Sequence, residues 1–500
     1  MGDRLYLGVD IGTYETKGVL VNLSGNIIAQ SAKKHELLIP QKGWAEHRPI
    51  DDWWDDFIFI CRDLINKSKC NPKDIKAVTS SAIGPCMLPV DKSGTPLMNA
   101  VLYGVDTRAS EEIKELNSTI GEKNIIEFGG NPLTSQSIGP KILWLQKNRK
   151  DIYKKTYKIL NSTSYINFRL TGKYFIDHFS GANTTPFYDI KNQKWSNTIT
   201  SNLINLNILP DLTWTDEIIG EVNEIASTET GLAKGTLVTA GTIDAAAEAL
   251  SVGVISPKDM MMMYGSTMFF ILLTKKPVFD NRMWYAPWLF KGEHASLAGL
   301  STSGTLTHWF KNNFAKEIDS AKPFEILAKE AEKSPRGSNG VIFLPYFSGE
   351  RTPIHDTHAK GTFFGLNLTH KREDLYRSIF EGIAYGTKHV FDTLEDLNNM
   401  PQNLFSVGGG TKNPLWSQTT SDVIGLTQLI KKITFGASYG DAFLSALSCG
   451  DVTKEEINNW NKIDKKIISK NYKEYESGYN FFRRLYNQTK DIMQDMDVNL

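Results

Sequence analysis

Val238–Leu250, with the sequence VTAGTIDAAAEAL, predicts a short apolar strand, a Gly-Thr turn and an alanine-rich helix, in that order. Asp244 stands where the turn meets the helix, so its carboxylate faces helical N–H groups that favour a negative charge. In that place Asp244 is a candidate general base, a group that takes the proton of a reacting hydroxyl. The alternative is that Asp244 caps the helix, since Asp is among the preferred N-cap residues. The stretch by itself leaves both interpretations open.

The composition predicts a globular protein whose partner is a small molecule. A chain of 500 residues exceeds what one core usually organises, so we expect two large domains. Hydrophobic residues make up 41% and charged residues 22%, which is ordinary for a globular protein. Lys and Arg together number 56, as do Asp and Glu, so the formal net charge is zero. We therefore expect no nucleic acid and no membrane as a partner.

The cysteines and the start of the chain predict a cytoplasmic protein. The four cysteines form no CxxC pair, which fits a reducing compartment. The first strand begins by Leu5, which leaves no room for a signal peptide. The most apolar run, Met260–Leu273, is interrupted by Gly265 and is too short to span a bilayer. A homodimer stays open as the oligomeric state.

The N-terminus predicts a hairpin that carries polar groups at its turn. Residues 5–13 form an apolar strand that runs into Gly12-Thr13, and residues 16–21 form the returning strand. Asp10 lies inside the apolar strand, where acids are seldom found without a partner. Together, the Asp10 carboxylate, the N–H and hydroxyl groups of the turn and the cation of Lys17 could hold phosphate oxygens and a divalent ion, since hard oxygen ligands suit Mg²⁺. The alternative is an ordinary hairpin with a solvated Asp10.

A second hairpin repeats this pattern later in the chain. Residues 259–273 again give a strand, a glycine turn at Gly265-Ser266-Thr267 and a strand, so we expect two similar domains that face each other. A third glycine turn, Gly408–Thr411, follows another apolar strand. Asn413-Pro414 then predicts a helix start, with Asn at the N-cap and Pro in the first turn. Glycine turns before helix N-termini let the backbone approach a nucleotide closely.

Matched blocks of sequence make the chain resemble a known family. Gly361–Leu366 (GTFFGL) and Asp374–Glu381 (DLYRSIFE) have the spacing of a signature of the FGGY family of carbohydrate kinases. Leu344–Pro353 (LPYFSGERTP) is similar to a run common in sugar kinases, and Gly139–Leu145 (GPKILWL) matches a second signature in part. The resemblance extends from about Leu5 to about Gly450 and is greatest for the xylulokinase-like branch of this actin/Hsp70/hexokinase superfamily.

The resemblance implies a fold and a division into domains. It implies an α/β fold with two ribonuclease-H-like (actin-like ATPase) domains facing a central cleft. The N-terminal domain would cover residues 1–250 and hold the sugar, the first phosphate loop and the catalytic Asp. The C-terminal domain would cover residues 251–450 and bind the nucleotide. Beyond the resemblance, the charged pattern of residues 451–500 predicts a helical tail that packs on the body through apolar residues at helical spacing, namely Tyr475, Tyr479, Phe482 and Leu485.

The resemblance also implies roles for residues already selected on chemical grounds. Asp244 matches the catalytic base that deprotonates the sugar hydroxyl. Asp10 matches the acid near the Mg²⁺ of MgATP, and Thr13 and Lys17 match positions on the phosphate side of that loop. Ser266 matches the second phosphate loop. The positions that match the surroundings of the adenosine are Gly304, Gly409, Gly410 and Asn413, the last with helix capping as an alternative role.

The residues expected on the substrate side match the family pattern only in part. Trp44 lies in a run that resembles a family loop whose aromatic residue lies against the sugar. Asp106 lies in a run that takes the place of Trp-Asn-Asp-Gly-Arg in bacterial xylulokinases, which implies a contact with sugar hydroxyls. Pro85 stands where xylulokinases usually carry a His near the substrate. Proline cannot replace an imidazole donor, so the exact sugar stays open. The alternative is that Pro85 only shapes the turn and that a side chain such as Asp106 provides the polar contact.

We therefore predict an ATP-dependent carbohydrate kinase that uses ATP and Mg²⁺. A ketopentose such as D-xylulose is the first candidate for the acceptor, and ribulose, fuculose, gluconate and glycerol stay as alternatives. A second class of function is a nucleotide-dependent sugar sensor without catalysis, since the superfamily includes proteins that move rather than phosphorylate. Asp244 discriminates between them, because a sensor needs no base aimed at a hydroxyl.

Overall fold

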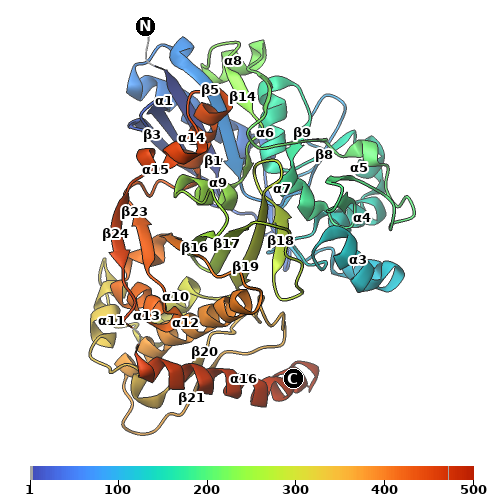
Figure 1. Ribbon diagram of the computed structural model, residues 1–500. Coiled ribbons are helices and arrows are strands. Elements are labelled where there is room, and N and C mark those ends of the chain that lie inside the picture. Colours follow the sequence, from blue (N-terminus) through green and yellow to red (C-terminus); the bar gives the residue numbers. More distant parts are fainter. Residues whose placement is uncertain (1–3, 471, 500) are drawn as a thin grey trace.

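The computed structural model describes residues 4–470 and 472–499, and two seven-stranded sheets organise them (Figure 1). The first sheet comprises β1 (Leu5–Ile11), β2 (Glu15–Asn22), β3 (Ile27–Lys34), β5 (Ile75–Ala82), β13 (Ile218–Glu221), β14 (Leu237–Thr239) and β15 (Thr242–Ile243). β1 pairs antiparallel with β2, and β2 with β3, while β5 and β14 continue the sheet in parallel on the other side of β1. β1 and β5 are almost wholly buried because helices cover both faces.

The second sheet repeats this pairing. It comprises β16 (Asp259–Tyr264), β17 (Met268–Thr274), β18 (Trp284–Pro287), β19 (His294–Leu300), β22 (Asn403–Val407), β23 (Gln428–Lys431) and β24 (Ile463–Ile467). β16 and β17 form the antiparallel hairpin, β19 extends it, and β22 pairs in parallel with β16. The two predicted hairpins are therefore the equivalent cores of two similar α/β domains.

Two helices cross where the domains meet. α9 (Asp244–Ser251) and α14 (Ala437–Ser448) approach so closely that a Cβ on Gly440 would lie 2.0 Å from the Ala247 carbonyl oxygen. α14 also packs on β1, since the Ser445 hydroxyl donates to the Leu7 carbonyl at 3.1 Å. α14 thus covers the first sheet, although it falls within the segment 251–450 that we expected to form the second domain. Long-range packing, not chain order, decides this placement.

The other helices cover the sheets or form an insertion. Residues between β5 and β13 include a separate cluster of small helices beside the first sheet (Figure 1). These helices are α2 (Ser110–Leu116), α3 (Glu122–Gly129), α4 (Ile138–Asn148) and α5 (Lys150–Lys155). Of the next two helices, α6 (Ser162–Thr171) packs on the first sheet and α7 (His178–Gly181) contacts β15. Those around the sheets are α1 (Asp55–Ser68), α8 (Glu224–Thr230), α10 (Gly304–Phe314), α11 (Pro323–Ala331), α12 (Arg372–Asp396) and α13 (Pro414–Ile424). Short two-stranded pairs comprise β4 (Glu46–His47), β6 (Leu88–Val90), β7 (Ala100–Val101), β8 (Lys158–Leu160), β9 (Phe175–Asp177), β10 (Tyr188–Asp189), β11 (Lys194–Trp195), β12 (Asp211–Thr213), β20 (Ile342–Leu344) and β21 (Thr362–Phe364).

The C-terminal segment is less helical than its charge pattern predicts. After α15 (Ile457–Trp460), strand β24 pairs antiparallel with β23 at the edge of the second sheet, and α16 (Lys473–Asn499) follows. The pairing with β23 holds this charged stretch extended, an interaction that local pattern does not show. α16 buries Tyr475, Phe482 and Leu485 against the second domain, as the helical spacing predicts. Within residues 4–470 and 472–499, no helix combines the length and apolarity needed to cross a membrane.

Candidate active site

A cavity of about 360 Å³ is lined by residues of both domains. The first domain contributes Asp10, Thr13 and Asp244 to its wall. The second domain contributes Thr267, in the turn of its hairpin, and Arg351. Residues that are far apart in the sequence therefore meet at the junction of the two sheets, and this cavity is the candidate active site.

Asp244 begins α9 directly after β15 and faces the cavity. Its Oδ1 accepts the N–H of Ala245 at 2.6 Å, while Ile243 occupies the N-cap position. The alternative that Asp244 is the N-cap is therefore wrong, because Asp244 is already helical. Burial raises the pKa of the Asp244 carboxyl above its ordinary value, the Ala245 N–H opposes this, and the charge of Glu248 adds to it. A half-buried carboxylate with a raised pKa is suited to accept a proton near neutral pH.

Further acids surround Asp244. Asp10 lies near the end of β1, opposite Lys17 in the hairpin register, and accepts the Ser81 hydroxyl at 3.3 Å. Burial and the charge of Asp244 raise the pKa of Asp10, although Lys17 and Ser81 lower it. Glu248 lies one turn beyond Asp244, and burial followed by the charge of Asp10 raises its pKa to about 7. So many acids in one cavity indicate a place for a cation.

Mg²⁺ fits the cluster through one carboxylate rather than through a cage. Among the described residues, no group of three or more His, Cys, Asp or Glu side chains is arranged to hold a metal ion. Mg²⁺ commonly keeps several waters and binds one or two carboxylates together with substrate phosphates. Asp10 offers such a carboxylate, and the buried Oδ1 of neighbouring Asp441 has no hydrogen-bond partner. The donors present therefore fit a phosphate-bound Mg²⁺.

The turn of the first hairpin rests on two histidines that sequence reasoning missed. His35 lies 3.0 Å from the Gly12 carbonyl through Nε2, and His47 lies 3.0 Å from the Thr13 carbonyl through Nε2. Trp53 donates to Nδ1 of His47, so His47 donates through Nε2 and is neutral. Burial lowers the pKa of His47 to about 4. The two rings hold the Gly12 and Thr13 carbonyls, the Gly12 N–H donates to the Glu15 carbonyl at 3.0 Å, and Thr13 lines the cavity.

Lys17 lies beside the cavity rather than in its wall. Its ammonium is 3.4 Å from the Glu15 carboxylate, and its side chain is 44% exposed. It still lies near enough to Asp10 and Glu248 to lower the pKa of both carboxyls. The charge of Lys17 therefore acts on the acids of the cavity, and its contact with a phosphate stays a prediction.

Ser266 and Gly304 are brought together at the second hairpin. The Ser266 carbonyl accepts the Ser303 N–H at 3.0 Å, and the Gly265 carbonyl accepts the Gly304 N–H at 3.0 Å. A Cβ on Gly304 would lie 2.5 Å from the Gly265 oxygen, so α10 can begin against the turn only with glycine there. Ser266 is exposed, with its hydroxyl free to meet a ligand at the turn.

The third glycine turn leads into α13. The Asn413 side chain accepts the Trp416 N–H at 3.2 Å and Pro414 follows in the first turn, so the predicted helix cap is confirmed. Gly410 faces the Trp416 ring, whereas a Cβ on Gly409 would meet nothing within 4 Å. The backbone at Gly409 is therefore accessible, and the role of this turn at the adenosine stays a prediction.

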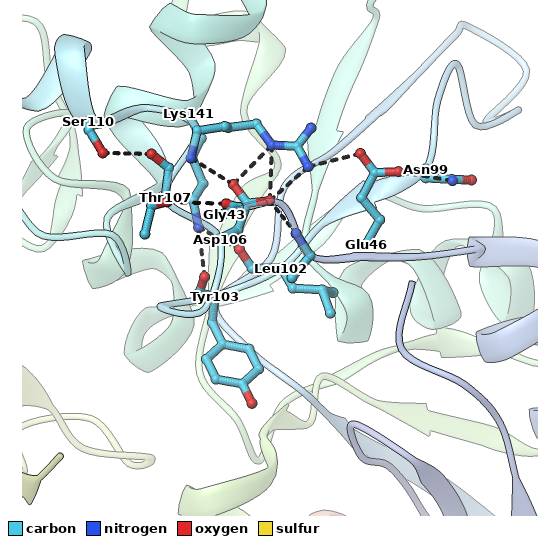
Figure 2. Close-up of polar contacts among 11 residues, drawn as sticks. Gly43, Glu46, Asn99, Leu102, Tyr103, Asp106, Thr107, Ser110 and Lys141 are labelled. Carbon is cyan, nitrogen blue, oxygen red and sulfur yellow. Dashed lines mark hydrogen bonds and ion pairs between the residues drawn. The ribbon is translucent and has the colours of Figure 1, made fainter. Parts of the chain in front are cut away.

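Tyr103 lines the cavity and is positioned by a buried network. Its hydroxyl lies 3.3 Å from the Thr13 hydroxyl, which joins the inserted loop to the first hairpin. Lys141, buried on α4, donates from Nζ to the carbonyls of Leu102 (2.5 Å) and Tyr103 (3.1 Å). Figure 2 shows the Tyr103 ring pointing away from this network. A buried ammonium thus fixes the backbone from which the ring extends.

Asp106 lies at the centre of that network, not at the cavity wall (Figure 2). It is fully buried, with Oδ2 accepting the Ala45 N–H at 2.7 Å and Nη2 of Arg108 at 2.7 Å. Oδ1 accepts Nε of Arg108 at 2.9 Å. Trp44 is half-buried, and the Arg108 guanidinium lies 3.8 Å from its ring centroid. Neither Asp106 nor Trp44 lines the cavity, and the polar atoms of Asp106 are held by protein groups, so their contacts with a sugar stay a prediction.

Pro85 is buried and lines the cavity beside Ile83 and Gly84. The wall where xylulokinases usually carry a His is thus apolar. Sequence reasoning missed Arg351 and Glu248, which also line the cavity. Glu248 could have been found as the residue one helical turn after Asp244. No local sequence pattern singled out Arg351, apart from its position in Leu344–Pro353, the stretch similar to a run common in sugar kinases.

Comparison with known proteins agrees with this geometry. The FGGY family of carbohydrate kinases matches with its N-terminal domain over residues 5–251 and with its C-terminal domain over residues 260–449. The xylulose kinase of Bacillus subtilis (strain 168) is 26% identical over 496 residues, covering 98% of each chain. The gluconokinase of the same organism is 25% identical, covering 93% of this chain and 90% of the other. The crystal structure of xylulose kinase from Rhodospirillum rubrum matches with a TM-score of 0.91 and 26% identity, over 98% of this chain and 100% of that chain. The chain therefore belongs to the FGGY family of carbohydrate kinases.

Proposed function

We propose that the protein transfers the γ-phosphoryl group of ATP to a hydroxyl of a small sugar, with D-xylulose as the first candidate. The observation that carries this proposal is the position of Asp244, whose half-buried carboxylate with a raised pKa faces the cavity between the domains. Within the described part of the chain, Asp244 forms no ion pair that would neutralise it. A sensor needs no such group, whereas a kinase needs one to accept the proton of the sugar hydroxyl.

The reaction follows from this placement. The sugar hydroxyl oxygen attacks the γ-phosphorus, a new O–P bond forms, and the P–O bond to ADP breaks. Asp244 takes the proton of the attacking hydroxyl, and its raised pKa makes it a stronger base than an exposed aspartate. The protein contributes mainly positioning and charge, because phosphoryl transfer needs little covalent help.

The phosphate and nucleotide contacts are proposed from family resemblance, and the placement of Asp10 and Thr13 in the cavity wall supports them. Asp10 would hold Mg²⁺, which supplies positive charge to the phosphate oxygens. Thr13 and Lys17 would contact the phosphates from the first hairpin, and Ser266 from the second. The adenosine would lie along Gly304, Gly409, Gly410 and Asn413.

The acceptor sugar is proposed from the relatives and from the cavity wall. D-Xylulose comes first because relatives over the full length are xylulose kinases, and gluconate is next because a gluconokinase is 25% identical. The apolar wall at Pro85 offers no imidazole donor, so we assign the polar contacts to Asp244 and to the Tyr103 hydroxyl. Both groups line the cavity.

The test pairs a substrate panel with one variant. ADP formation is measured with D-xylulose, D-ribulose, L-ribulose, L-xylulose, L-fuculose, D-gluconate and glycerol. With the best sugar, Asp244→Asn should lower kcat by about a hundred- to ten-thousand-fold, because a general base contributes that much. Calorimetry should show that Asp244→Asn still binds ADP and sugar. Asp464→Asn, exposed on β24, is the control and should be unaffected. Near wild-type kcat in Asp244→Asn would exclude this assignment.

A further inference from the structure

Arg351 is the one cationic side chain among the described residues that line the cavity. The same wall carries the carboxylates of Asp10, Asp244 and Glu248. Arg351 comes from the second domain, in the loop that follows β20, whereas the three acids come from the first. One guanidinium of the second domain therefore shares the cavity with three carboxylates of the first domain.

The guanidinium is buried without a full set of partners. Its Nη2 donates to the Leu300 carbonyl at 2.7 Å, but its buried Nε has no hydrogen-bond partner. The neighbouring Glu350 carboxylate accepts the backbone N–H groups of Ser301 and Arg351 instead of the guanidinium. Within residues 4–470 and 472–499, Arg351 forms no ion pair with a carboxylate. Leaving a charged donor buried and unsatisfied costs free energy, so the arrangement favours an anion in the cavity.

The position of Arg351 indicates which anion that is. A Cβ on Gly299 would lie 3.0 Å from Cζ of Arg351, so the guanidinium lies against β19. In the sheet, Gly299 and Leu300 pair with the first residues of β17, directly after the turn that carries Ser266. The guanidinium is therefore next to the second phosphate loop and faces the cavity that holds Asp244.

We propose that Arg351 is a catalytic residue that binds the phosphoryl group during its transfer. The inference rests on the proposed function, because it assigns a further group to the same reaction. As the sugar oxygen bonds to phosphorus and the bond to ADP breaks, Nε and an Nη group donate to non-bridging phosphoryl oxygens. Arg351 neither gains nor loses a proton, and the hydroxyl proton goes to Asp244. A planar guanidinium suits this role since two of its N–H groups can bind two phosphate oxygens at once.

The same guanidinium could instead bind the carboxylate of an acid sugar such as gluconate, because both ligands present anionic oxygens. The two ligands, the phosphoryl group and the sugar carboxylate, can be distinguished because each would make a different kinetic constant depend on Arg351. A phosphoryl contact made in the transition state changes kcat with every acceptor. A carboxylate contact changes KM for gluconate and leaves a neutral ketose unaffected.

The experiment compares Arg351→Met with Arg336→Met, an arginine that stacks on Tyr472 outside the cavity. For Arg351→Met we expect kcat to fall by about a hundred- to a thousand-fold with every accepted sugar, as for removal of one preorganised charge donor. The KM for a neutral ketose should change less than about threefold. Arg336→Met should behave as the wild type.

A binding measurement separates this proposal from the proposed function. With sugar present, Arg351→Met should lose the tight binding of MgADP with aluminium fluoride, which mimics the transferring phosphoryl group, but keep the affinity for MgADP alone. If Arg351→Met does not fold, Arg351→Gln keeps a donor for Leu300 and gives the same comparison. Unchanged kcat and aluminium fluoride binding, or a loss confined to the KM for gluconate, would overturn the proposal. A wild type that phosphorylates no sugar would instead refute the proposed function.

Discussion

Replacing His35 by leucine should loosen the first phosphate loop and remove a pH-dependent part of the stability. His35 is enclosed, with 3% of its side chain exposed. Its Nε2 faces the Gly12 carbonyl at 3.0 Å and its Nδ1 faces the Asp56 carboxylate at 2.8 Å. Both partners can only accept hydrogen bonds, so both ring nitrogens must donate and the imidazolium is favoured.

The size of the effect follows from these two contacts. A hydrogen bond to a charged group contributes about 1.5–3 kcal/mol, so two give about 3–6 kcal/mol in gross terms. Removing His35 also removes the free-energy cost of burying its charge, which offsets part of this loss. The Asp56 carboxylate keeps two partners, the Lys33 ammonium at 2.8 Å and the Thr16 hydroxyl at 3.0 Å, which limits the loss further. We therefore expect His35→Leu to lower the free energy of unfolding by at least about 2 kcal/mol at pH 6.

The dependence on pH has a definite sign. Burial lowers the pKa of His35, but the bond and charge of Asp56, the Gly12 carbonyl and the charge of Asp52 outweigh it, so the net pKa is raised. A group whose pKa is raised in the folded state contributes its full stabilisation of the fold at pH values below its unfolded pKa, which is about 6.5 for histidine. That contribution is lost as the pH rises through the folded pKa. The stability difference between wild type and His35→Leu should shrink accordingly. Histidines distant from His35 cancel in this difference. His47 does not cancel fully, because the charge of His35 is one cause of its lowered pKa, after burial.

Urea unfolding of wild type, His35→Leu and the control His308→Leu, which changes an exposed histidine on α10, measures this difference from pH 5.5 to 9. The KM for MgATP is a second readout and should rise in His35→Leu, because the Gly12 carbonyl loses its donor. A stability difference that is constant across this range, or that grows with pH, would refute the reasoning.

Two further predictions concern the metal and the sugar. Asp10→Ala should lower turnover and recover part of it when Mg²⁺ is raised, whereas Asp244→Asn should not respond; identical responses in steady-state kinetics would contradict the separate roles of the two acids. Because Pro85 presents an apolar wall, the wild type should discriminate among ketopentoses by no more than about 10–200-fold, the range that apolar contacts provide. Comparing kcat/KM across the sugar panel checks this, and an exclusive preference for D-xylulose would contradict it.

Local sequence was enough to predict the elements that hold the site. The two glycine-turn hairpins are short-range structures, so alternation and turn residues predicted both, and their repetition predicted two similar domains. The Asn413 cap likewise depends on neighbours within a few residues. Asp244 could be selected because a strand, a turn and a helix start meet at it.

Tertiary structure alone decided which side chains reach the cavity. Asp106 is held by Arg108 and an N–H group 61 residues away, and therefore does not face the cavity as its motif implied. Arg351 enters the cavity and His35 supports the first hairpin through contacts that no local pattern encodes. β24 is extended because β23 offers it a free edge, despite its charged sequence. Hydrogen bonds and packing between distant segments outweigh local preference, so they, and not spacing along the chain, determine the environment of each polar group.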